Sequence, residues 1–293
     1  MMGDRMSDVT LLSAAAAGTI KVGSFEVNRI GFGAMRITGS GVWGEPADHD
    51  NAIAVLKRAA EVGVNFIDTA DAYGPEVSEN LIHEALHPYD GLVIATKGGM
   101  TRGGPGDWQS DGSPKHLKDA CNESLKRLGV SQIQIYQFHR PDPKVSFTDS
   151  LKALIELQDE GKIKHIGLSN VTLGQLQQAL EMTEIVSVQN HYNFTHRQDS
   201  EEVLSFCEEN GIAFIPYFPI GGNMGGFQQE TLKAIAEIHK ASVYQIALAW
   251  LLQHSPAMLP IPGTSSIEHL EQNIAASHIN LTSEDIDKLD SVG

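Results

Sequence analysis

The amino-acid sequence predicts an α/β protein that folds as a single (β/α)8 barrel of the TIM type. Three observations favour this fold. Apolar strand-like runs alternate with amphipathic helical runs, and no composition break or Pro/Gly/Ser-rich linker interrupts them. The runs IGFGAM, LVIATK and AFIPYF are apolar on both faces, as parallel strands covered by helices are. The 293 residues also leave room for eight βα units, because such barrels usually need about 250 residues.

The strands follow one another in a regular order. A hairpin comes first, with strands at residues 19–22 and 25–27 joined by the turn-forming pair Gly23-Ser24. Residues 1–18 are expected to be a flexible tail, and residues 19–293 are expected to form the barrel. Its eight strands are predicted at residues 29–35, 64–68, 92–97, 133–139, 163–169, 185–190, 212–217 and 258–261.

Helices are expected between these strands. Residues 48–62 read as a helix because Ile53, Leu56 and Ala60 recur at roughly helical spacing, and Gly63 ends it. Another helix opens with Ser113-Pro114, residue types preferred at the N-cap and the first helical position. The further helices are expected at residues 76–86, 113–128, 147–160, 173–182, 200–210, 228–239, 243–254, 267–276 and 283–292, the last being a short C-terminal helix.

An open, doubly wound sheet is the competing fold. Such a sheet needs a glycine-rich phosphate-binding turn between its first strand and the helix that follows. The segment GFGAMR supplies Gly31 and Gly33 but lacks the third glycine, and a polar loop follows it rather than a helix. The barrel is therefore favoured.

Composition excludes several classes of protein. Hydrophobic residues make up 41% of the chain and charged residues 20%, which excludes intrinsic disorder. The net charge of −16 excludes a general affinity for nucleic acid or anionic membranes. No apolar run approaches the ~18 residues of a membrane span, and the start MMGDRMSDV lacks the basic leader of a signal peptide. The chain has only two cysteines, Cys121 and Cys207, so we expect a reducing compartment and a cytoplasmic protein. No obligate protein partner is evident from the sequence.

Four chemically active side chains stand where predicted strands end. Asp68 ends the second strand and Tyr73 follows in the loop, whereas Lys97 and His139 end the third and fourth strands. Active sites of barrels gather at the carboxyl ends of the strands. A nearby ammonium favours phenolate, so we expect Lys97 to lower the pKa of Tyr73, and Asp68 to keep Lys97 charged. Such a group would protonate an oxyanion as hydride reaches a carbonyl carbon.

Each of these residues also has a plainer interpretation. Asp68 could cap the next helix, Tyr73 could belong to a turn, Lys97 could be a solvated charge at the rim, and His139 could be a satisfied rim histidine. All four at successive strand ends are much less easily explained that way. A metal site is another reading of His139 and Asp68, but no HxH, HExxH or CxxC spacing supports one, so no metal is expected.

At these residues the chain resembles the aldo-keto reductase superfamily, from about Gly18 to Gly293. The segments NFIDTADAYG, IATKGG and IYQFHRPDP carry the aspartate, tyrosine, lysine and histidine of that family. The resemblance implies a barrel with an N-terminal hairpin. It also implies that Tyr73 is the proton donor, that Lys97 and Asp68 tune it, and that His139 orients the substrate carbonyl.

The resemblance implies a nicotinamide cofactor, with NADP(H) preferred over NAD(H). Amide and hydroxyl side chains would hydrogen-bond the carboxamide, an aromatic ring would stack on the nicotinamide, and glycines would let the backbone approach the pyrophosphate. The residues implied for these tasks are Ser169, Asn170 and Gln189, then Tyr217, then Gly221 and Gly222; Met35, after the first strand, is also assigned to the cofactor site. Asn170 alone could instead cap a helix, although Thr172 could take that place.

The segment IPGTSSIEHLEQN matches the family's binding site for the adenosine 2′-phosphate, with one departure. Many members have lysine where this chain has Gly263 and arginine where it has His269. The remaining phosphate ligands would be Thr264, Ser265 and backbone N–H groups at a helix start. Gln272 and Asn273 match the adenine-contacting pair. Losing two cations should weaken the preference for NADPH without removing it.

Loops are expected to set substrate specificity. The largest is residues 98–112, treated as a glycine-rich loop. The candidate substrate residues are Trp43, Trp108, Arg140 and Phe218, with Met35 and residues 224–227 as further parts of an apolar wall. Trp108 could instead only anchor a mobile loop. The chain stops soon after its last helix, so an open pocket is expected.

The expected reaction is reduction of an aldehyde or ketone to an alcohol. The segments HIGLSNVT, VSVQNHYNFTHR and YFPIGG resemble a bacterial branch of the superfamily that includes pyridoxal reductases, which makes pyridoxal a candidate substrate and pyridoxine its product. A general aldehyde reductase is the alternative within this class. Two other classes remain open: a non-enzymatic barrel subunit that binds nicotinamide cofactor, and an isomerase or aldolase that uses Lys97 as a Schiff-base amine.

Overall fold

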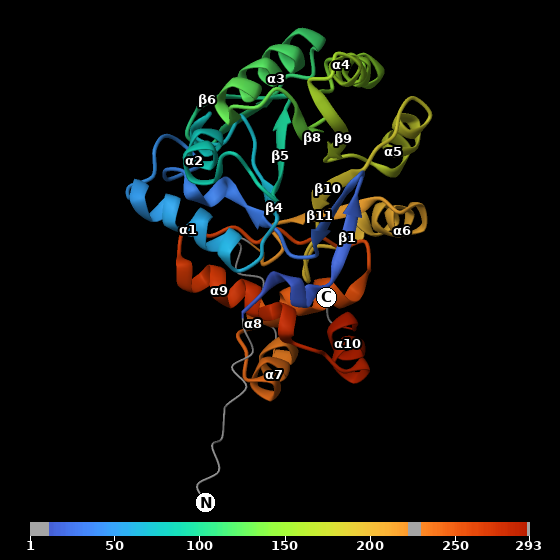
Figure 1. The fold of residues 1–293 in the computed structure, drawn as a ribbon. Helices are drawn as coiled ribbons and strands as arrows, with labels where there is room; N and C mark the ends of the chain where they lie inside the picture. The colour runs from blue at the N-terminus through green and yellow to red at the C-terminus, as the bar shows by residue number, and fades with distance from the viewer. Residues whose placement is uncertain (1–11, 222–229, 292–293) are drawn as a thin grey trace, which may run out of the picture.

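Helices surround a curled parallel sheet in the computed structural model, which describes residues 12–221 and 230–291 (Figure 1). The sheet has seven strands in the order β11-β10-β9-β8-β5-β4-β3, and all of its neighbouring strands are parallel. Its order follows the chain, which makes the architecture TIM-like. The strands are β3 (Phe32–Gly33), β4 (Phe66–Asp68), β5 (Val93–Gly98), β8 (Ile133–Phe138), β9 (Ile163–Ser169), β10 (Ser187–His191) and β11 (Ala213–Tyr217).

The helices from α1 to α7 alternate with these strands, and in the described chain α8 to α10 follow with no further regular strand between them. Their first turns carry the expected signals: Ser113 accepts from the backbone of His116 at the start of α3, and Thr172 forms a capping box with Gln175 at the start of α5. Thr172, and not Asn170, therefore caps α5. The helices are α1 (His49–Glu61), α2 (Val77–Leu86), α3 (Pro114–Leu128), α4 (Phe147–Asp159), α5 (Leu173–Leu180), α6 (Glu201–Asn210), α7 (Glu230–His239), α8 (Val243–His254), α9 (Ile267–Ala275) and α10 (Ser283–Asp290).

The first and the last of the predicted strands, at residues 29–35 and 258–261, differ from the prediction. The first strand is only two residues long, because the good helix formers after Gly33 turn into a 3-10 helix, η2 (Ala34–Ile37). The predicted strand at 258–261 is an extended segment rather than a regular strand, since Pro260 and Pro262 lack the N–H that a ladder needs. Backbone bonds nevertheless reach it from both sides: Leu259 donates to Phe214, and Gly31 donates to Pro260.

The segment predicted as a loop at residues 98–112 contains an antiparallel hairpin. It pairs β6 (Met100–Gly104) with β7 (Asp107–Ser110), and the register shifts between Arg102 and Gly104. Exposed and less exposed side chains alternate along both strands, which is the pattern of a half-buried ribbon. The glycine content of this segment suggested a loop, but Gly103 lies at the register shift within β6, and Gly104 and Gly106 lie at the turn.

A second hairpin, β1 (Thr19–Val22) with β2 (Phe25–Asn28), closes the other end of the sheet. Val22 and Val27 are fully buried and belong to an apolar cluster with residues near the starts of the sheet strands, such as Phe66 and Val93. At its turn, the backbone N–H of Ser24 donates to His165 on β9 at 3.0 Å. The hairpin therefore forms the floor of the barrel.

The predicted tail at residues 1–18 lies partly outside the described residues. From Leu12 onward it is folded: η1 (Ala14–Ala17) packs on the barrel with Ala14 fully buried. Ala14 donates its backbone N–H to Val62 at 2.8 Å, and Ser277 donates to the carbonyl of Ser13 at 3.2 Å. These contacts join the start of the described chain both to the end of α1 and to the last third of the chain.

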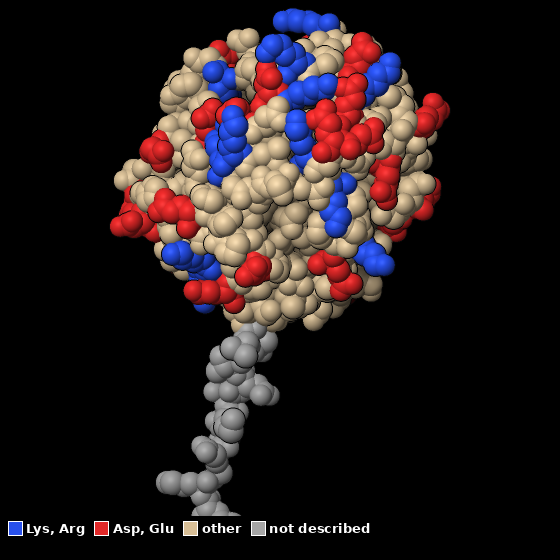
Figure 2. Space-filling view, turned by 45° about the horizontal axis from the view of Figure 1, so that its top comes forward, with Lys and Arg blue, Asp and Glu red and all other residues tan. Residues whose placement is uncertain are grey.

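The surface mixes charges of both signs. On the face shown in Figure 2, lysine and arginine side chains stand among aspartate and glutamate side chains around a largely uncharged centre. Among the described helices, none combines the length and the apolar character needed to cross a bilayer.

Candidate active site

Three of the four predicted side chains meet in a buried cluster at the carboxyl ends of β4 and β5. Lys97 Nζ donates to Asp68 Oδ2 at 2.6 Å, to the carbonyl of Thr69 at 2.8 Å and to the hydroxyl of Tyr73 at 3.2 Å. Lys97 is 0% exposed and Asp68 is 1% exposed. Lys97 is therefore not a solvated charge at the rim. Its three donors are all used within the protein.

The second carboxylate oxygen of Asp68 is also satisfied. Gln137 on β8 and Gln189 on β10 each donate an amide N–H to Asp68 Oδ1 at 2.8 Å. Asp68 is thus the centre of a hydrogen-bonded layer across several strands and does not cap α2. Both carboxylate oxygens of Asp68 are therefore hydrogen-bonded within the protein.

The pKa of Tyr73 differs in direction from the sequence-based expectation. Burial raises the pKa of this phenol, and the charge of Lys97 lowers it, but burial has the larger effect and the pKa lies above its usual value. The sequence predicts a lowered pKa for Tyr73 because it shows the nearby lysine but not how deeply the phenol is buried. Its hydroxyl is therefore protonated at neutral pH and available as an acid.

Lys97 keeps its charge despite its burial. Burial opposes the ammonium form, yet the carboxylate of Asp68 and the hydroxyl of Tyr73 outweigh it and raise the pKa of Lys97. A Schiff base requires a neutral amine, so the ionised, fully engaged Lys97 does not suit the isomerase or aldolase alternative.

His139 faces the same space from the end of β8. Its ring lies edge-on to Tyr73, with centroids 5.9 Å apart, and it is 8% exposed. Its Nδ1 is buried without a hydrogen-bond partner, so His139 is not a satisfied rim histidine. Burial, together with the charges of Lys97 and Arg140, holds its pKa well below the usual 6.5. The imidazole is therefore neutral at physiological pH.

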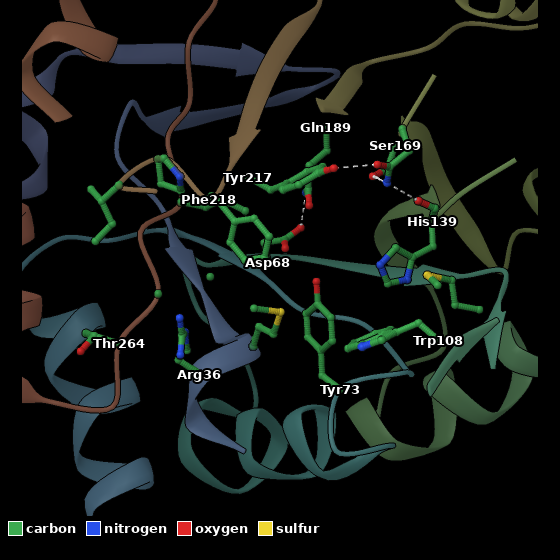
Figure 3. Close-up of a pocket in the computed structure, with 18 of the residues that line it drawn as sticks. Arg36, Asp68, Tyr73, Trp108, His139, Ser169, Gln189, Tyr217, Phe218 and Thr264 are labelled. Atoms are coloured by element: carbon green, nitrogen blue, oxygen red, sulfur yellow. Dashed lines mark hydrogen bonds between the residues drawn. The ribbon is translucent and has the colours of Figure 1, made fainter. Parts of the chain in front are cut away.

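Asp68, Tyr73 and His139 line one end of a cavity of about 570 Å³ (Figure 3), and Lys97 lies behind them. The hydroxyl of Tyr73 points into it, and Trp108 and His139 lie together on one side of the Tyr73 ring. Arg36 and Thr264 lie at the other end. The cavity therefore combines a proton-donating end with a polar end that carries a guanidinium.

The residues implied for the nicotinamide line the middle of the cavity. Asn170 donates to the carbonyl of His139 and to Ser169 Oγ, both at 3.0 Å, and accepts from the hydroxyl of Tyr217 at 2.8 Å. One face of the Tyr217 ring is backed by His191, with centroids 5.2 Å apart and planes 6° apart. The structure thus brings Ser169, Asn170, Gln189 and Tyr217 together beside Tyr73.

At the other end of the cavity, the missing lysine at Gly263 has a geometric explanation. A Cβ atom at Gly263 would lie 2.4 Å from the carbonyl oxygen of Gly33, too close for any side chain without a backbone shift. The same Cβ would lie 3.6 Å from Cγ of Arg36, whose side chain lines this end with Thr264, Ser265 and His269. Arg36, which the sequence reasoning did not select, thus supplies a cation beside Gly263.

Other predicted cofactor residues have different positions. Met35 lines the cavity. Gly221 directly follows Ile220, another lining residue, and has a left-handed φ of 75°. Gly222, like residues 224–227, lies outside the described residues. Gln272 and Asn273 stand on α9 and are not among the residues lining the cavity. Their roles stay predictions.

The predicted substrate residues divide into two groups. Trp108, Arg140 and Phe218 line the cavity, as does Met100, which the sequence reasoning missed because it treated residues 98–112 as an irregular loop. Phe218 has a φ of 52°, an unusual conformation for a bulky residue that often marks functional sites. Trp43 does not line the cavity: it pairs through its backbone with Gly74, and its ring lies under the guanidinium of Arg102, 5.5 Å away.

Within the described part of the chain, no group of three or more histidine, cysteine, aspartate or glutamate side chains is placed to hold a metal ion. The two cysteines are buried thiols, and burial raises the pKa of each to about 12.

Comparison with known proteins agrees with this geometry. Residues 29–293 match the aldo/keto reductase family. An uncharacterized oxidoreductase of Schizosaccharomyces pombe is 51% identical over 282 residues, which cover 96% of this chain and 92% of that protein. Pyridoxine 4-dehydrogenase of Escherichia coli is 43% identical over 285 residues, covering 94% and 99%. A crystal structure of an aldo-keto reductase from Klebsiella pneumoniae in complex with NADPH has a TM-score of 0.79 at 27% identity, covering 94% of each chain.

A TIM-like sheet whose strand ends carry a buried lysine–aspartate pair, a tyrosine and a neutral histidine defines a class of barrel oxidoreductases. The chain belongs to the aldo/keto reductase family, and it is an NAD(P)H-dependent oxidoreductase of that family. The predicted family is thereby confirmed.

Proposed function

We propose that the protein reduces an aldehyde or ketone to an alcohol with NADPH, and that Tyr73 is the proton donor. The observation that carries this proposal is the contact of the Tyr73 hydroxyl with the buried, ion-paired Lys97 at 3.2 Å, inside a cavity that His139 also faces. A protonated phenol next to a fixed positive charge is suited to give a proton to an alkoxide and to remain as a stabilised phenolate.

The chemistry divides between cofactor and protein. Bound reduced nicotinamide would supply a hydride to the carbonyl carbon. Tyr73 then gives its hydroxyl proton to the carbonyl oxygen, and the phenolate left behind faces the ammonium of Lys97. Asp68 keeps that ammonium charged and in place. The neutral imidazole of His139 has an N–H to hold the carbonyl oxygen near Tyr73, without a positive charge to compete with Lys97.

The residues of the cavity fit a nicotinamide dinucleotide. Ser169, Gln189 and the aromatic ring of Tyr217 line the middle of the cavity, and the proton donor Tyr73 lines the same cavity. Gly33 and Gly263 approach so closely that a Cβ on either would meet backbone of the other segment, so this part of the cavity wall is bare backbone. These groups suit a carboxamide and a stacked ring.

The preference for NADPH over NADH is supported by the polar end of the cavity. Arg36 provides a guanidinium that can bind phosphate through two N–H groups, and Thr264 and Ser265 provide hydroxyls. Ser266 caps α9 directly after them, so the positive end of the helix dipole also faces this end. The relative from Klebsiella pneumoniae was crystallised with NADPH.

Pyridoxal is the specific substrate that we propose, with pyridoxine as the product. The 43% identity to a pyridoxine 4-dehydrogenase supports it. A flat hydroxypyridine aldehyde could lie against Trp108, with its carbonyl between Tyr73 and His139, and Arg140 is a polar partner at the cavity wall. Other aromatic aldehydes of similar shape would fit the same wall.

The proposed barrel is closed, with residues 257–261 standing in place of an eighth strand. The backbone bonds of this segment to Phe214 on one side and Gly31 on the other support that arrangement. In a closed barrel this segment lies beside β3, which brings Gly263 against Gly33 at the polar end of the cavity.

Two measurements test the proposal. The fluorescence of bound cofactor, titrated with NADPH and NADH, should show tighter binding of NADPH. Turnover under NADPH should then be compared for pyridoxal, benzaldehyde and propanal. Turnover of benzaldehyde but not pyridoxal would remove the vitamin substrate and leave the reaction class. No turnover of any aldehyde with either cofactor would overturn the proposed function.

A further inference from the structure

We infer that Arg102 is a positioning residue that fixes an aromatic wall against Tyr73 and thereby makes the site select flat aromatic aldehydes. The inference rests on the proposed carbonyl reduction and adds to it a determinant of substrate class. Arg102 does not line the cavity itself, so it acts through the residues that it holds.

The guanidinium of Arg102 is matched by backbone carbonyls from three segments. Its Nη1 donates to Val42 and to Ala72, both at 2.9 Å, and its Nε donates to Asp107 at 3.1 Å. Its Nη2 has longer contacts with Gly41 at 3.3 Å and Gly104 at 3.4 Å. These five acceptors equal the donor capacity of arginine, which no other side chain offers. Arg102 therefore ties the β6–β7 hairpin to two loops of the barrel rim.

The same guanidinium packs on the aromatic wall. It lies 3.6 Å from the ring centroid of Trp108, its partner across the β6–β7 hairpin, which is a close cation–π contact. Trp108 in turn lies edge-on to Tyr73, with centroids 6.3 Å apart and planes 77° apart. The position of Trp108 over the proton donor therefore depends on Arg102.

Arg102 also fixes the loop that carries Tyr73. Ala72, whose carbonyl it binds, directly precedes Tyr73 and is 2% exposed. On the other side, Gly74 receives the backbone N–H of Gly44 and pairs with Trp43, over which the guanidinium also lies. Both sequence neighbours of Tyr73 are thus held: Ala72 accepts a hydrogen bond from Arg102, and Gly74 pairs with Trp43, which lies under the Arg102 guanidinium.

One strained residue supports the view that this contact is maintained for function. Val42 has a φ of 58°, a conformation that is rare for a β-branched residue and must be stabilised by its surroundings. Its carbonyl accepts one of the two short bonds from Arg102 Nη1. A two-stranded hairpin is also only marginally stable alone, so β6–β7 needs an anchor of this kind.

The test compares substrates rather than total activity. Arg102→Lys keeps the charge but loses the planar fork and its stacking face. We expect kcat/KM for benzaldehyde to fall at least about tenfold, chiefly through KM, while kcat/KM for propanal falls less than about threefold. The dissociation constant of NADPH should change less than about twofold, because Arg102 is remote from the polar end of the cavity.

Two further variants keep the inference falsifiable if Arg102→Lys folds poorly. Trp108→Ala leaves the backbone contacts of Arg102 in place and should cause the same loss for benzaldehyde. In the double variant the two losses should not add, because both act on one wall. Arg197→Lys is the matched control, since Arg197 also lies over a tryptophan, Trp250 at 5.4 Å, but on the far side of the barrel.

The outcomes separate the two proposals. Equal losses for benzaldehyde and propanal in Arg102→Lys, or additive losses in the double variant, would show that Arg102 only supports the fold and would overturn this inference. A wild-type protein that reduces neither aldehyde with NADPH or NADH would instead overturn the proposed function.

Discussion

Replacing Lys97 by methionine tests the centre of the proposed site most directly. Lys97→Met removes the ammonium but leaves the buried carboxylate of Asp68 with only the two amide donors of Gln137 and Gln189. Breaking a buried ion pair by removing one partner costs about 3–5 kcal/mol, because a buried charge is left without compensation. We therefore expect the free energy of unfolding in urea to fall by roughly this amount.

A double variant separates stability from chemistry. Asp68→Asn combined with Lys97→Met removes both charges, so most of the lost stability should return. The rate should not return, because the phenolate left on Tyr73 after proton transfer would have no positive charge beside it. In both variants kcat for aldehyde reduction should stay at least about a hundredfold below the wild-type value.

The assay needs a matched lysine and a clear refuting result. Lys115 pairs with Asp119 at 2.5 Å on the exposed side of α3, so Lys115→Met should leave both the unfolding midpoint and kcat unchanged. If Lys97→Met unfolded within about 1 kcal/mol of wild type, the buried-pair reasoning would be wrong. If it kept wild-type kcat, Lys97 would have no part in proton transfer.

Four further predictions concern the proton donor and the cofactor. Tyr73→Phe should reduce kcat by roughly a factor of hundreds or more, with little change in NADPH binding. Wild-type turnover in that variant would show that Tyr73 is not the proton donor. Burial raises the pKa of Tyr73, so the phenol stays protonated at higher pH, and burial lowers the pKa of His139, so the imidazole stays neutral at lower pH. A profile of kcat against pH for reduction should therefore show no transition near pH 6.5 and no loss up to about pH 9. Arg36→Met should raise KM for NADPH about tenfold and KM for NADH much less, and an equal rise for both cofactors would place Arg36 away from the 2′-phosphate. His269→Arg should lower KM for NADPH, since arginine can bind phosphate through two N–H groups, and unchanged cofactor kinetics would show that His269 points elsewhere.

Most of the fold was predictable from the sequence because the alternation of apolar strands and amphipathic helices is a local signal. The failures lie where tertiary structure decides. Residues 258–261 were predicted as a strand from their apolar character, but proline removes the donors of a regular ladder. The β6–β7 hairpin was missed because its glycines resemble a loop, and its anchor Arg102 binds carbonyls far away in the sequence.

The candidate site shows the same division. The strand-end positions of Asp68 and Lys97 followed from sequence, and their 2.6 Å contact agrees with that reading. The direction of the Tyr73 pKa did not follow, because burial cannot be read from residue types at a strand end. Arg36 was missed because its nearness to Gly263 joins residues more than two hundred positions apart, which a reading of local sequence does not bring together.

The floor formed by β1 and β2 has a consequence for how cofactor and substrate enter and leave the enzyme. Val22 and Val27 fill that end with fully buried apolar side chains, so on the proposed function cofactor and substrate would enter and leave from the loop side of the sheet. Release of the alcohol and of the oxidised cofactor on the same side would then be part of every turnover.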